Sequence, residues 1–242
     1  MTNSPTSKLK QIIAIGGVSL EPSGLLETYL LAQTNKANPK VCFVPTASGE
    51  SQEYIDRFYT SFSQLSCTAS HLSLFKLPTA DLRSFILEKD LIYVGGGNTK
   101  SLLALWREWH LDSILREAWE AGVVLAGWSA GSICWFEQGV TDSIPERLSV
   151  LRCLGFLKGS NCPHYDAEPE RRPSYQKFLR EDSISEGYAA DNEAVLHFVG
   201  EKLVRVISSL PQAKAYRLEK MGETVQETQL ESVYLGFLQK SS

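Results

Sequence analysis

The sequence has no excess of basic residues and no long apolar segment. Its 242 residues hold 24 Lys and Arg against 28 Asp and Glu, so the net charge is −4. Nucleic-acid-binding domains carry a basic patch, and this charge balance therefore argues against nucleic acid as a partner. The longest apolar stretch contains glycine and serine and is a poor membrane span. Residues 1–10 are polar and carry no apolar signal segment, so we expect a cytoplasmic protein with no membrane partner.

Cysteine pairs are also missing. Five cysteines are scattered along the chain, and no two of them stand in a C-x-x-C motif: Cys42, Cys67, Cys134, Cys153 and Cys162. An odd, scattered set indicates reduced thiols rather than a disulfide framework, and we expect Cys134 to be a core residue. No group of His, Cys and Asp has the spacing of a metal site. We therefore expect neither a metal nor an organic cofactor.

The first half of the sequence alternates short apolar runs with longer amphipathic ones. Strands are predicted at 11–17, 40–45, 69–75, 90–97 and 123–128, and helices at 22–33, 51–65, 79–89, 99–109 and 111–122. This alternation predicts an α/β fold in which a mostly parallel sheet is flanked by helices on both faces. Ligand sites in such folds form beyond the carboxyl ends of the strands.

The pattern weakens after Phe136. A polar loop and one helix follow, and then C-terminal antiparallel strands are predicted over 186–209, 215–220 and 233–238, with a turn at Gly200–Glu201. Internal repeats and Pro- or Ser-rich linkers are absent from the sequence. We therefore predict a single domain over residues 1–242, with residues 1–10 flexible.

A serine stands between two glycines at the end of the fifth predicted strand. The stretch "VVLAGWSAGSICWF" contains G-x-S-x-G, with Ser129 as its serine. One interpretation is a strand, a tight turn and a helix, with small residues where chains pack closely. The other is a nucleophile elbow, in which the turn holds Ser129 in a strained conformation with its Oγ exposed.

A serine nucleophile needs a base and a group that orients the base. Of the four histidines, His71 and His197 lie in strand-like runs, and His110 follows a helix as a surface or cap residue. His164 lies in the polar loop "NCPHYD", where a base could sit, although an exposed loop histidine is the alternative interpretation.

Three acids compete for the orienting position. Asp142 lies between the serine and the histidine, Asp191 follows a short strand-like run, and Glu193 is close behind it. Acyl transfer also needs backbone donors for the oxyanion. Ala130 can supply one, and the loop Gly95–Thr99 can supply another, because its glycines allow close approach of a ligand. A phosphate-binding loop is the weaker interpretation of that loop, because it matches no phosphate motif.

The motifs "VGGGNT", "AGWSAGS" and "NCPHYD", in this order and spacing, resemble those of the peptidase E (aspartyl dipeptidase) family of serine peptidases, to which cyanophycinase is related. The resemblance runs from the first strand to about Val199. It implies a fold like the class I glutamine amidotransferase domain, which is flavodoxin-like, with serine in place of the nucleophilic cysteine. The site residues that it implies are Ser129 as nucleophile, His164 as base, Asp191 (alternatively Asp142) as the acid, and Gly97, Gly96 and Ala130 as the oxyanion hole.

The resemblance further implies cleavage of short peptides after an N-terminal aspartate. Candidate substrate-binding residues are Asn98, in the glycine-rich loop, and Arg171 and Arg172, which could bind a carboxylate. A solvated mixed-charge loop is the alternative interpretation of the two arginines. The alternative functions are a cyanophycinase-like or other serine acyl hydrolase (an esterase or amidase) and a non-catalytic binding protein. We expect a small peptide substrate, and a homodimer remains open beside a monomer.

Overall fold

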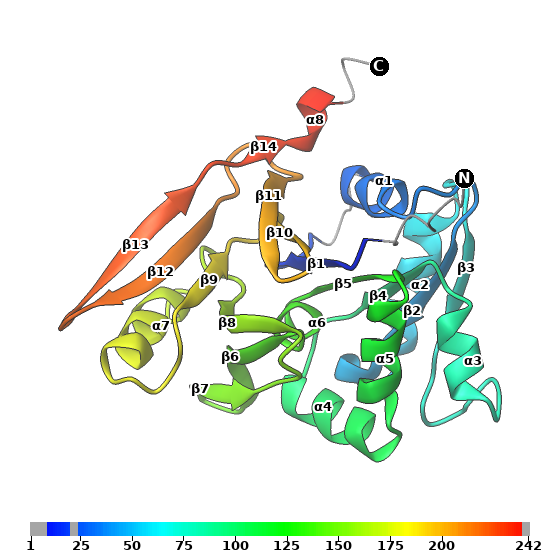
Figure 1. The fold of residues 1–242 in the computed structure, drawn as a ribbon, viewed down its shortest axis with the longest axis horizontal. Coiled ribbons are helices and arrows are strands. Elements are labelled where there is room, and N and C mark those ends of the chain that lie inside the picture. The colour runs from blue at the N-terminus through cyan, green and yellow to red at the C-terminus, as the bar shows by residue number, and fades with distance from the viewer. Residues whose placement is uncertain (1–8, 20–23, 239–242) are drawn as a thin grey trace, which may run out of the picture.

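The structure is a computed structural model that describes residues 9–19 and 24–238. Residues 1–8 of the stretch that we expected to be flexible, and Pro22 at the predicted start of the first helix, lie outside the described residues. The described chain forms two β-sheets with helices packed around the larger one (Figure 1). The prediction of one domain over the whole chain stays a prediction.

The larger sheet has eight strands in the order β14-β11-β10-β1-β5-β4-β2-β3. Five parallel strands form one part of it: β1 (Gln11–Ile15), β5 (Val124–Trp128), β4 (Leu91–Val94), β2 (Lys40–Val44) and β3 (Thr68–His71). Beyond β1 lie β10 (Ala194–Val199) and β11 (Lys202–Ser208), paired antiparallel, and the short β14 (Val233–Tyr234). This arrangement confirms the predicted α/β fold and the turn at Gly200.

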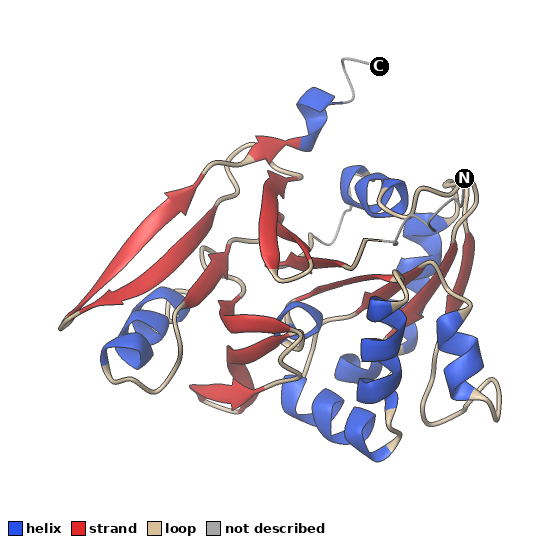
Figure 2. Cartoon of the chain, in the orientation of Figure 1, coloured by secondary structure: helices blue, strands red, loops and turns tan. Residues whose placement is uncertain are grey.

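Helices cover both faces of the larger sheet, as predicted (Figure 2). On one face α1 (Leu25–Ala32) and α2 (Gln52–Phe62) pack against Ile13 and Ile15 of β1. On the other face Ile12 and Ala14 belong to the same core cluster as side chains of α3 (Leu82–Leu87), α4 (Thr99–Glu108) and α5 (Leu111–Glu120). Successive side chains of a strand point to opposite faces, so an uninterrupted apolar run such as residues 11–15 is what a sheet covered on both faces requires.

The smaller sheet has six strands in the order β13-β12-β9-β8-β6-β7. Its strands are β6 (Phe136–Ile144), β7 (Arg147–Arg152), β8 (Leu157–Cys162), β9 (Gly187–Ala190), β12 (Ala215–Met221) and β13 (Thr224–Leu230). The inner strands β6, β8 and β9 pair parallel, and the outer pairs are antiparallel. Helix α7 (Arg171–Arg180) packs on this sheet through Tyr175 and Leu179, which share a small core with Val140 and Leu218.

Parts of the second half of the chain differ from the prediction. Between Phe136 and residue 186, where no strand was predicted, the chain forms β6, β7 and β8. Residues 233–238 form β14, which pairs parallel with β11, and the one-turn helix α8 (Leu235–Leu238), not an antiparallel strand. The helix after Ser129, α6 (Ala130–Ile133), has only four residues, so Cys134 caps its end instead of lying inside it. Cys134 is nevertheless fully buried, which confirms it as a core residue.

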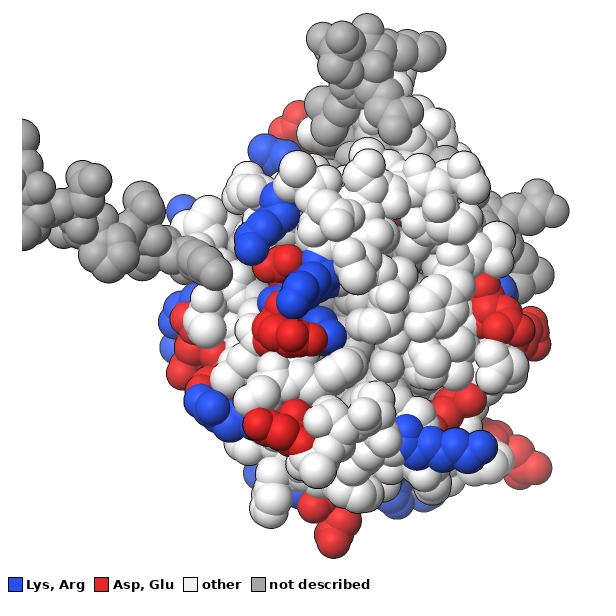
Figure 3. All heavy atoms as spheres, turned by 90° about the vertical axis from the view of Figure 1, so that its right-hand side faces the viewer, with Lys and Arg blue, Asp and Glu red and all other residues white. Residues whose placement is uncertain are grey.

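The surface carries charges of both signs. On the face drawn in Figure 3, basic and acidic side chains lie next to one another, and uncharged residues cover most of the area. The net charge is therefore not gathered into one patch on this face. Within the described residues, no helix combines the length and the apolar character that crossing a membrane would require.

Candidate active site

Ser129 occupies a strained turn at the carboxyl end of β5. Its φ of 53° and ψ of −115° lie in a region that non-glycine residues rarely adopt. The backbone N–H groups of Ser132 and Ile133 both donate to the Ser129 carbonyl oxygen at 2.9 Å, which starts α6 immediately after the turn. A positive φ at the serine of a strand-to-helix turn is the geometry expected of a nucleophile elbow.

The glycines on either side of Ser129 are required by close packing. A Cβ on Gly127 would lie 2.4 Å from the Gly131 carbonyl oxygen, and a Cβ on Gly131 would lie 2.3 Å from that of Val94. Neither distance leaves room for a side chain, because the obstructing atoms are backbone. Both interpretations of the G-x-S-x-G motif therefore hold together: the glycines permit tight packing, and the serine is presented at the turn.

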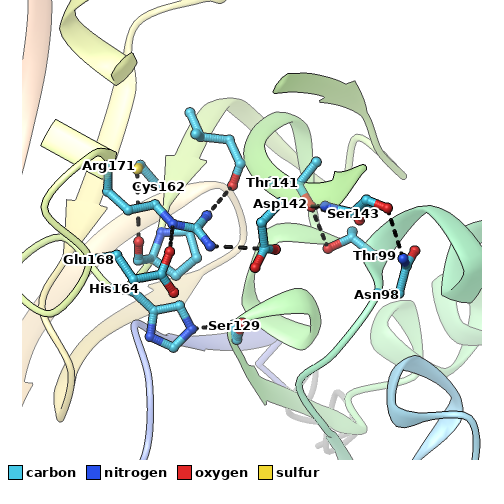
Figure 4. A network of polar contacts seen from close by, with 12 residues as sticks. Asn98, Thr99, Ser129, Thr141, Asp142, Ser143, Cys162, His164, Glu168 and Arg171 are labelled. Atoms are coloured by element: carbon cyan, nitrogen blue, oxygen red, sulfur yellow. Dashed lines mark hydrogen bonds and ion pairs between the residues drawn. The ribbon is translucent and has the colours of Figure 1, made fainter. Parts of the chain in front are cut away.

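His164 lies directly beside Ser129. It follows Cys162 at the end of β8 and Pro163, and its own φ is 54°. Its Nε2 is 2.8 Å from Ser129 Oγ, and its Nδ1 is 2.7 Å from the side-chain oxygen of Asn192. That oxygen can only accept, so the Nδ1–H donates to it and Nε2 is left to accept the proton of the serine hydroxyl. Figure 4 shows the imidazole turned toward Ser129.

Asn192 is the site residue that the sequence did not single out. It lies between β9 and β10, and its backbone N–H donates to Asp166 Oδ1 at 2.8 Å. A Cβ on Gly17, in the loop after β1, would lie 2.0 Å from Asn192 Oδ1 and 2.7 Å from His164 Nδ1. Gly17 thus lets the β1 loop pass against the His164–Asn192 pair. In the sequence, this contact could have been suspected from the glycine pair Gly16–Gly17 after the first strand and from the position of Asn192 next to Asp191.

Asp191 does not reach His164, which corrects our expectation that it orients the base. Its Oδ2 accepts from the Lys214 backbone N–H at 3.0 Å, and the side chain that meets His164 Nδ1 is that of the next residue, Asn192. Burial, together with the charge of Asp166, raises the pKa of Asp191 to about 6.

The other two acids are also engaged elsewhere. Asp142 is exposed and pairs with Arg171 at 3.5 Å. Glu193 is buried and accepts from the Ser19 backbone N–H and the Ser209 hydroxyl. Neither contacts His164 in the described part of the chain, so the group on Nδ1 is an amide and not a carboxylate.

Three backbone N–H groups near Ser129 are free. Those of Gly96, Gly97 and Ala130 have no acceptor among the described residues. Gly97 has a φ of 131°, which favours glycine, and packs against the Ala47 carbonyl oxygen at the short helix η1 (Thr46–Ser48). A Cβ on Gly96 would lie 3.2 Å from the Ser129 Cβ. The glycine-rich loop therefore brings unpaired donors to the side of the serine, as an oxyanion hole requires.

Asn98 and Arg171 hold the surrounding loops together. Asn98 caps α4 by accepting from the Ser101 N–H, and its amide donates to the Ser143 carbonyl oxygen at 2.9 Å. Arg171 is 1% exposed and contacts Glu168, Asp142 and the Val140 carbonyl oxygen. Figure 4 shows these residues lying around the Ser129–His164 pair. Arg171 is thus buried and engaged by three partners, whereas Asn98 uses one N–H of its amide for Ser143 and is half-buried.

Arg172 is more accessible than Arg171. Its side chain is 45% exposed and pairs with Glu227 at 3.5 Å. The guanidinium lies over the rings of Tyr165 and Tyr216, with its carbon 4.7 and 4.9 Å from their centres. Tyr165 directly follows His164, so the Arg172 guanidinium lies against the neighbour of that histidine. Of the two candidate arginines, Arg172 is therefore the one that is accessible to solvent.

The remaining histidines lie in structural positions. His197 is buried and shares hydrogen bonds with Tyr29 and Gln11, and His71 contacts the Tyr59 hydroxyl. His110 is the N-cap residue of α5, with a φ of 53°. Within residues 9–19 and 24–238, no group of three or more His, Cys, Asp or Glu side chains is arranged to hold a metal ion.

Comparison with known proteins places this geometry in a family. The model of peptidase family S51 matches residues 12–206. The uncharacterised peptidase YgaJ of Bacillus subtilis is 55% identical over 231 residues, which cover 94% of this chain and all of YgaJ. Peptidase E of Pasteurella multocida is 37% identical over 174 residues, covering 67% of this chain and 72% of that protein.

Solved structures share the fold. A peptidase from an acI-B1 actinobacterium superposes with a TM-score of 0.69 at 19% identity, over 93% of this chain and 96% of its own. A putative peptidase E of Listeria monocytogenes superposes with a TM-score of 0.62 at 21% identity, over 81% of this chain and 97% of its own.

Proposed function

The chain belongs to peptidase family S51, and from that premise we propose that it is a serine-type peptidase with Ser129 as nucleophile, His164 as general base and Asn192 as the residue that orients His164. The contact between His164 Nε2 and Ser129 Oγ, at 2.8 Å, carries the proposal. It also argues against a non-catalytic binding protein, for which nothing would keep a strained serine within hydrogen-bond reach of an imidazole.

In the acylation step, Ser129 Oγ attacks the carbonyl carbon of the scissile bond. The serine proton passes to His164 Nε2, which then donates it to the leaving amine as the C–N bond breaks. Asn192 Oδ1 keeps the Nδ1–H in place throughout, so the imidazole presents the correct nitrogen to the serine. Water then attacks the acyl-enzyme by the same path and releases the acid.

The free N–H groups of Ala130 and of the loop Gly96–Gly97 are the proposed oxyanion donors. During attack the carbonyl oxygen gains negative charge, and preorganised backbone donors stabilise it more strongly than they stabilise the ground state. Their preorganisation comes from the buried strands β4 and β5, which end two residues before Gly96 and Ala130. The mechanism uses only the chain's own residues and water.

For the substrate, we keep short peptides with an N-terminal aspartate as the first candidate. The relative called peptidase E in Pasteurella multocida and the partly exposed Arg172 beside His164 support this choice. An acyl hydrolase for other bonds is the second candidate. A panel of Asp-X dipeptides, isoaspartyl peptides and short-chain esters distinguishes the two candidates. Both use the same serine, so the class that is hydrolysed fastest identifies the preferred bond.

The first experiment compares wild type with Ser129→Ala on this panel. We expect turnover of the preferred substrate to fall by about four or more orders of magnitude, while thermal unfolding stays close to that of wild type. The exposed Ser113→Ala is the matched control and should retain full activity. Equal hydrolysis by Ser129→Ala and wild type would overturn the proposal.

A further inference from the structure

A small cavity lies beside Trp128, the residue before Ser129. Its volume is about 40 Å³, and aromatic side chains of α2 and of the sheet form much of its wall, with Phe58, Tyr93 and Trp128 among them. Glu27 of α1 lines the same cavity. A cavity of this size has room for about three water molecules or one small polar group.

Glu27 is buried without a full set of partners. Glu27 is 5% exposed, and its Oε2 has no hydrogen-bond partner within the described residues. Burial raises the pKa of Glu27, and the charge of the nearby Glu193 raises it further. Neither carboxylate forms an ion pair with a described lysine or arginine. A positive group bound beside Glu27 would stabilise the charged form of this carboxyl, which burial alone disfavours.

The cavity is linked to the candidate site by chain neighbours and by one hydrogen bond. Trp128 precedes Ser129, and Glu193 follows Asn192. Glu193 in turn accepts from the backbone N–H of Ser19, which lines the cavity two residues after Gly17, the glycine packed against His164. The lining thus includes the residue before the proposed nucleophile and a segment that is hydrogen-bonded to the neighbour of Asn192.

Arg57 also lines the cavity, and its guanidinium contacts groups other than Glu27. Its Nη2 donates to the Ser19 carbonyl oxygen at 3.1 Å, and its guanidinium carbon lies 5.9 Å from the centre of the Tyr54 ring. It forms no ion pair with Glu27 within the described residues, so the Oε2 of Glu27 remains available to a ligand.

We propose that this cavity binds an ammonium group of the substrate, with Glu27 as its hydrogen-bond acceptor and counter-ion. The inference rests on the proposed function, because it assigns the ammonium group to a peptide that Ser129 attacks. Aromatic walls favour a cation, and a charge-assisted hydrogen bond to a buried carboxylate is strong. The small volume fits an ammonium group on a short stem. The group comes either from a free peptide N-terminus or from a lysine-type side chain, and the experiment separates the two.

The test measures binding by calorimetry in the Ser129→Ala background, which prevents turnover. The probes are Ala-Leu, N-acetyl-Ala-Leu and N-acetyl-Lys-Leu. Glu27→Gln keeps the shape of the side chain and removes its charge. The matched control is Glu53→Gln, which removes an exposed acid from the first turn of the neighbouring helix α2. A thermal melt of each variant confirms that it is folded.

We expect Glu27→Gln to weaken binding of an ammonium-bearing probe by about tenfold or more, and Glu53→Gln to leave it unchanged. If Glu27→Gln weakens binding of Ala-Leu alone, and N-acetylation of Ala-Leu weakens binding to the same extent, the cavity binds the peptide N-terminus. Loss seen with N-acetyl-Lys-Leu assigns it to a side chain. Equal affinities in the two Gln variants for every probe, or no binding of any probe, would overturn the inference.

Hydrolysis by the protein with Ser129 intact judges the proposed function separately. Binding that depends on Glu27 without any hydrolysis would contradict the proposed function and leave the ammonium site in place. Hydrolysis that is insensitive to Glu27→Gln, together with equal binding, would contradict the ammonium site alone.

Discussion

The two sheets hold the two halves of the candidate site in different ways. Ser129 ends β5 in the middle of the larger sheet, where every residue of β1 and all but the last of β5 are buried. His164 follows β8 in the smaller sheet, whose outer strands β7 and β13 are partly exposed along their length. Apolar packing therefore fixes the position of Ser129, while the position of His164 depends more on polar contacts.

Those polar contacts gather around the loop after His164. Arg171 joins it to β6, and Tyr165 and Arg172 join it to β13 through Glu227. The comparison teaches that substitutions near Ser129 should act mainly through packing and strain, whereas substitutions near His164 should act through individual hydrogen bonds and charges. Four sets of variants probe this difference.

The largest effect is expected at Asn192, where the two sheets meet. Asn192→Ala removes the acceptor from His164 Nδ1, so the imidazole loses its fixed tautomer, and kcat should fall by roughly two to four orders of magnitude. Asp191→Asn should lower kcat by less than about tenfold, because Asn can still accept from the Lys214 N–H. Steady-state kinetics of both variants provide the measurement, and the reverse ranking would restore Asp191 as the orienting group.

Arg171 should have the next largest effect, on stability. Arg171→Met leaves Glu168, Asp142 and the Val140 carbonyl oxygen without their shared donor, and we expect the free energy of unfolding to fall by about 3 kcal/mol. Arg172→Met is the comparison variant. It loses an exposed ion pair and two ring contacts, for a cost of about 1 kcal/mol.

Chemical denaturation of both arginine variants provides the measurement. Similar losses of unfolding free energy in the two variants would mean that the burial of Arg171 does not make its contacts more stabilising than those of Arg172. Activity of Arg171→Met at a temperature where it is folded also reports on the loop, since a displaced His164 lowers kcat without changing the Ser129 turn.

Each sheet carries a titrating group, and the two act in opposite directions. Asp191, after β9, has its pKa raised from 3.8 to about 6 by burial and the charge of Asp166. Between these pH values the unfolded state loses its proton first, so this group lowers stability as the pH rises. His197, on β10, has its pKa lowered from 6.5 to about 4 by burial and the charge of Arg205. It lowers stability as the pH falls through the same window.

Single variants separate the two contributions. We expect the stability of Asp191→Asn to rise more steeply with pH between about 4 and 6 than that of wild type, and the stability of His197→Gln to rise less steeply or to fall. Unfolding free energies from urea titrations at several pH values provide the measurement. Unchanged slopes would mean that neither group is perturbed by folding.

The smallest expected effect is a difference in stability between two substitutions of Ser129. A φ of 53° with a ψ of −115° is strained for any residue with a Cβ, so Ser129→Gly should be more stable than Ser129→Ala by about 1 kcal/mol. Both variants should lack activity, so the comparison isolates strain from chemistry. Equal unfolding temperatures would indicate that the turn stores no strain.

The larger sheet could be predicted from the sequence because each of its central strands is a short apolar run followed by an amphipathic helix. The turn at Ser129 could be predicted for the same reason: two glycines interrupt a buried run. Beyond Phe136 the strands alternate less clearly, because β6 to β9 contain polar residues such as Ser160 and Asn161 that are buried and hydrogen-bonded.

The third member of the site could not be predicted because three polar residues follow β9 in succession. Asp191, Asn192 and Glu193 point in different directions, and only the chain path decides which one meets the imidazole. A carboxylate is the commoner acceptor for the Nδ1–H of such a histidine, so sequence reasoning favours Asp191 or Glu193 over the asparagine between them. The roles of Arg171 and Asn98 depend in the same way on partners that are distant in sequence.

The contact between Tyr165 and Glu227 ties the loop of His164 to the C-terminal hairpin of the smaller sheet. Tyr165 follows His164 and donates its hydroxyl proton to Glu227 at 2.6 Å, and Glu227 lies on β13, outside residues 12–206 that match the family model. The proposed catalytic residues could therefore be inherited intact while the strand that contacts the loop of one of them diverges. Relatives with the same serine and histidine but a different C-terminal hairpin would be expected to differ in rate, and grafting this hairpin between them would transfer that difference.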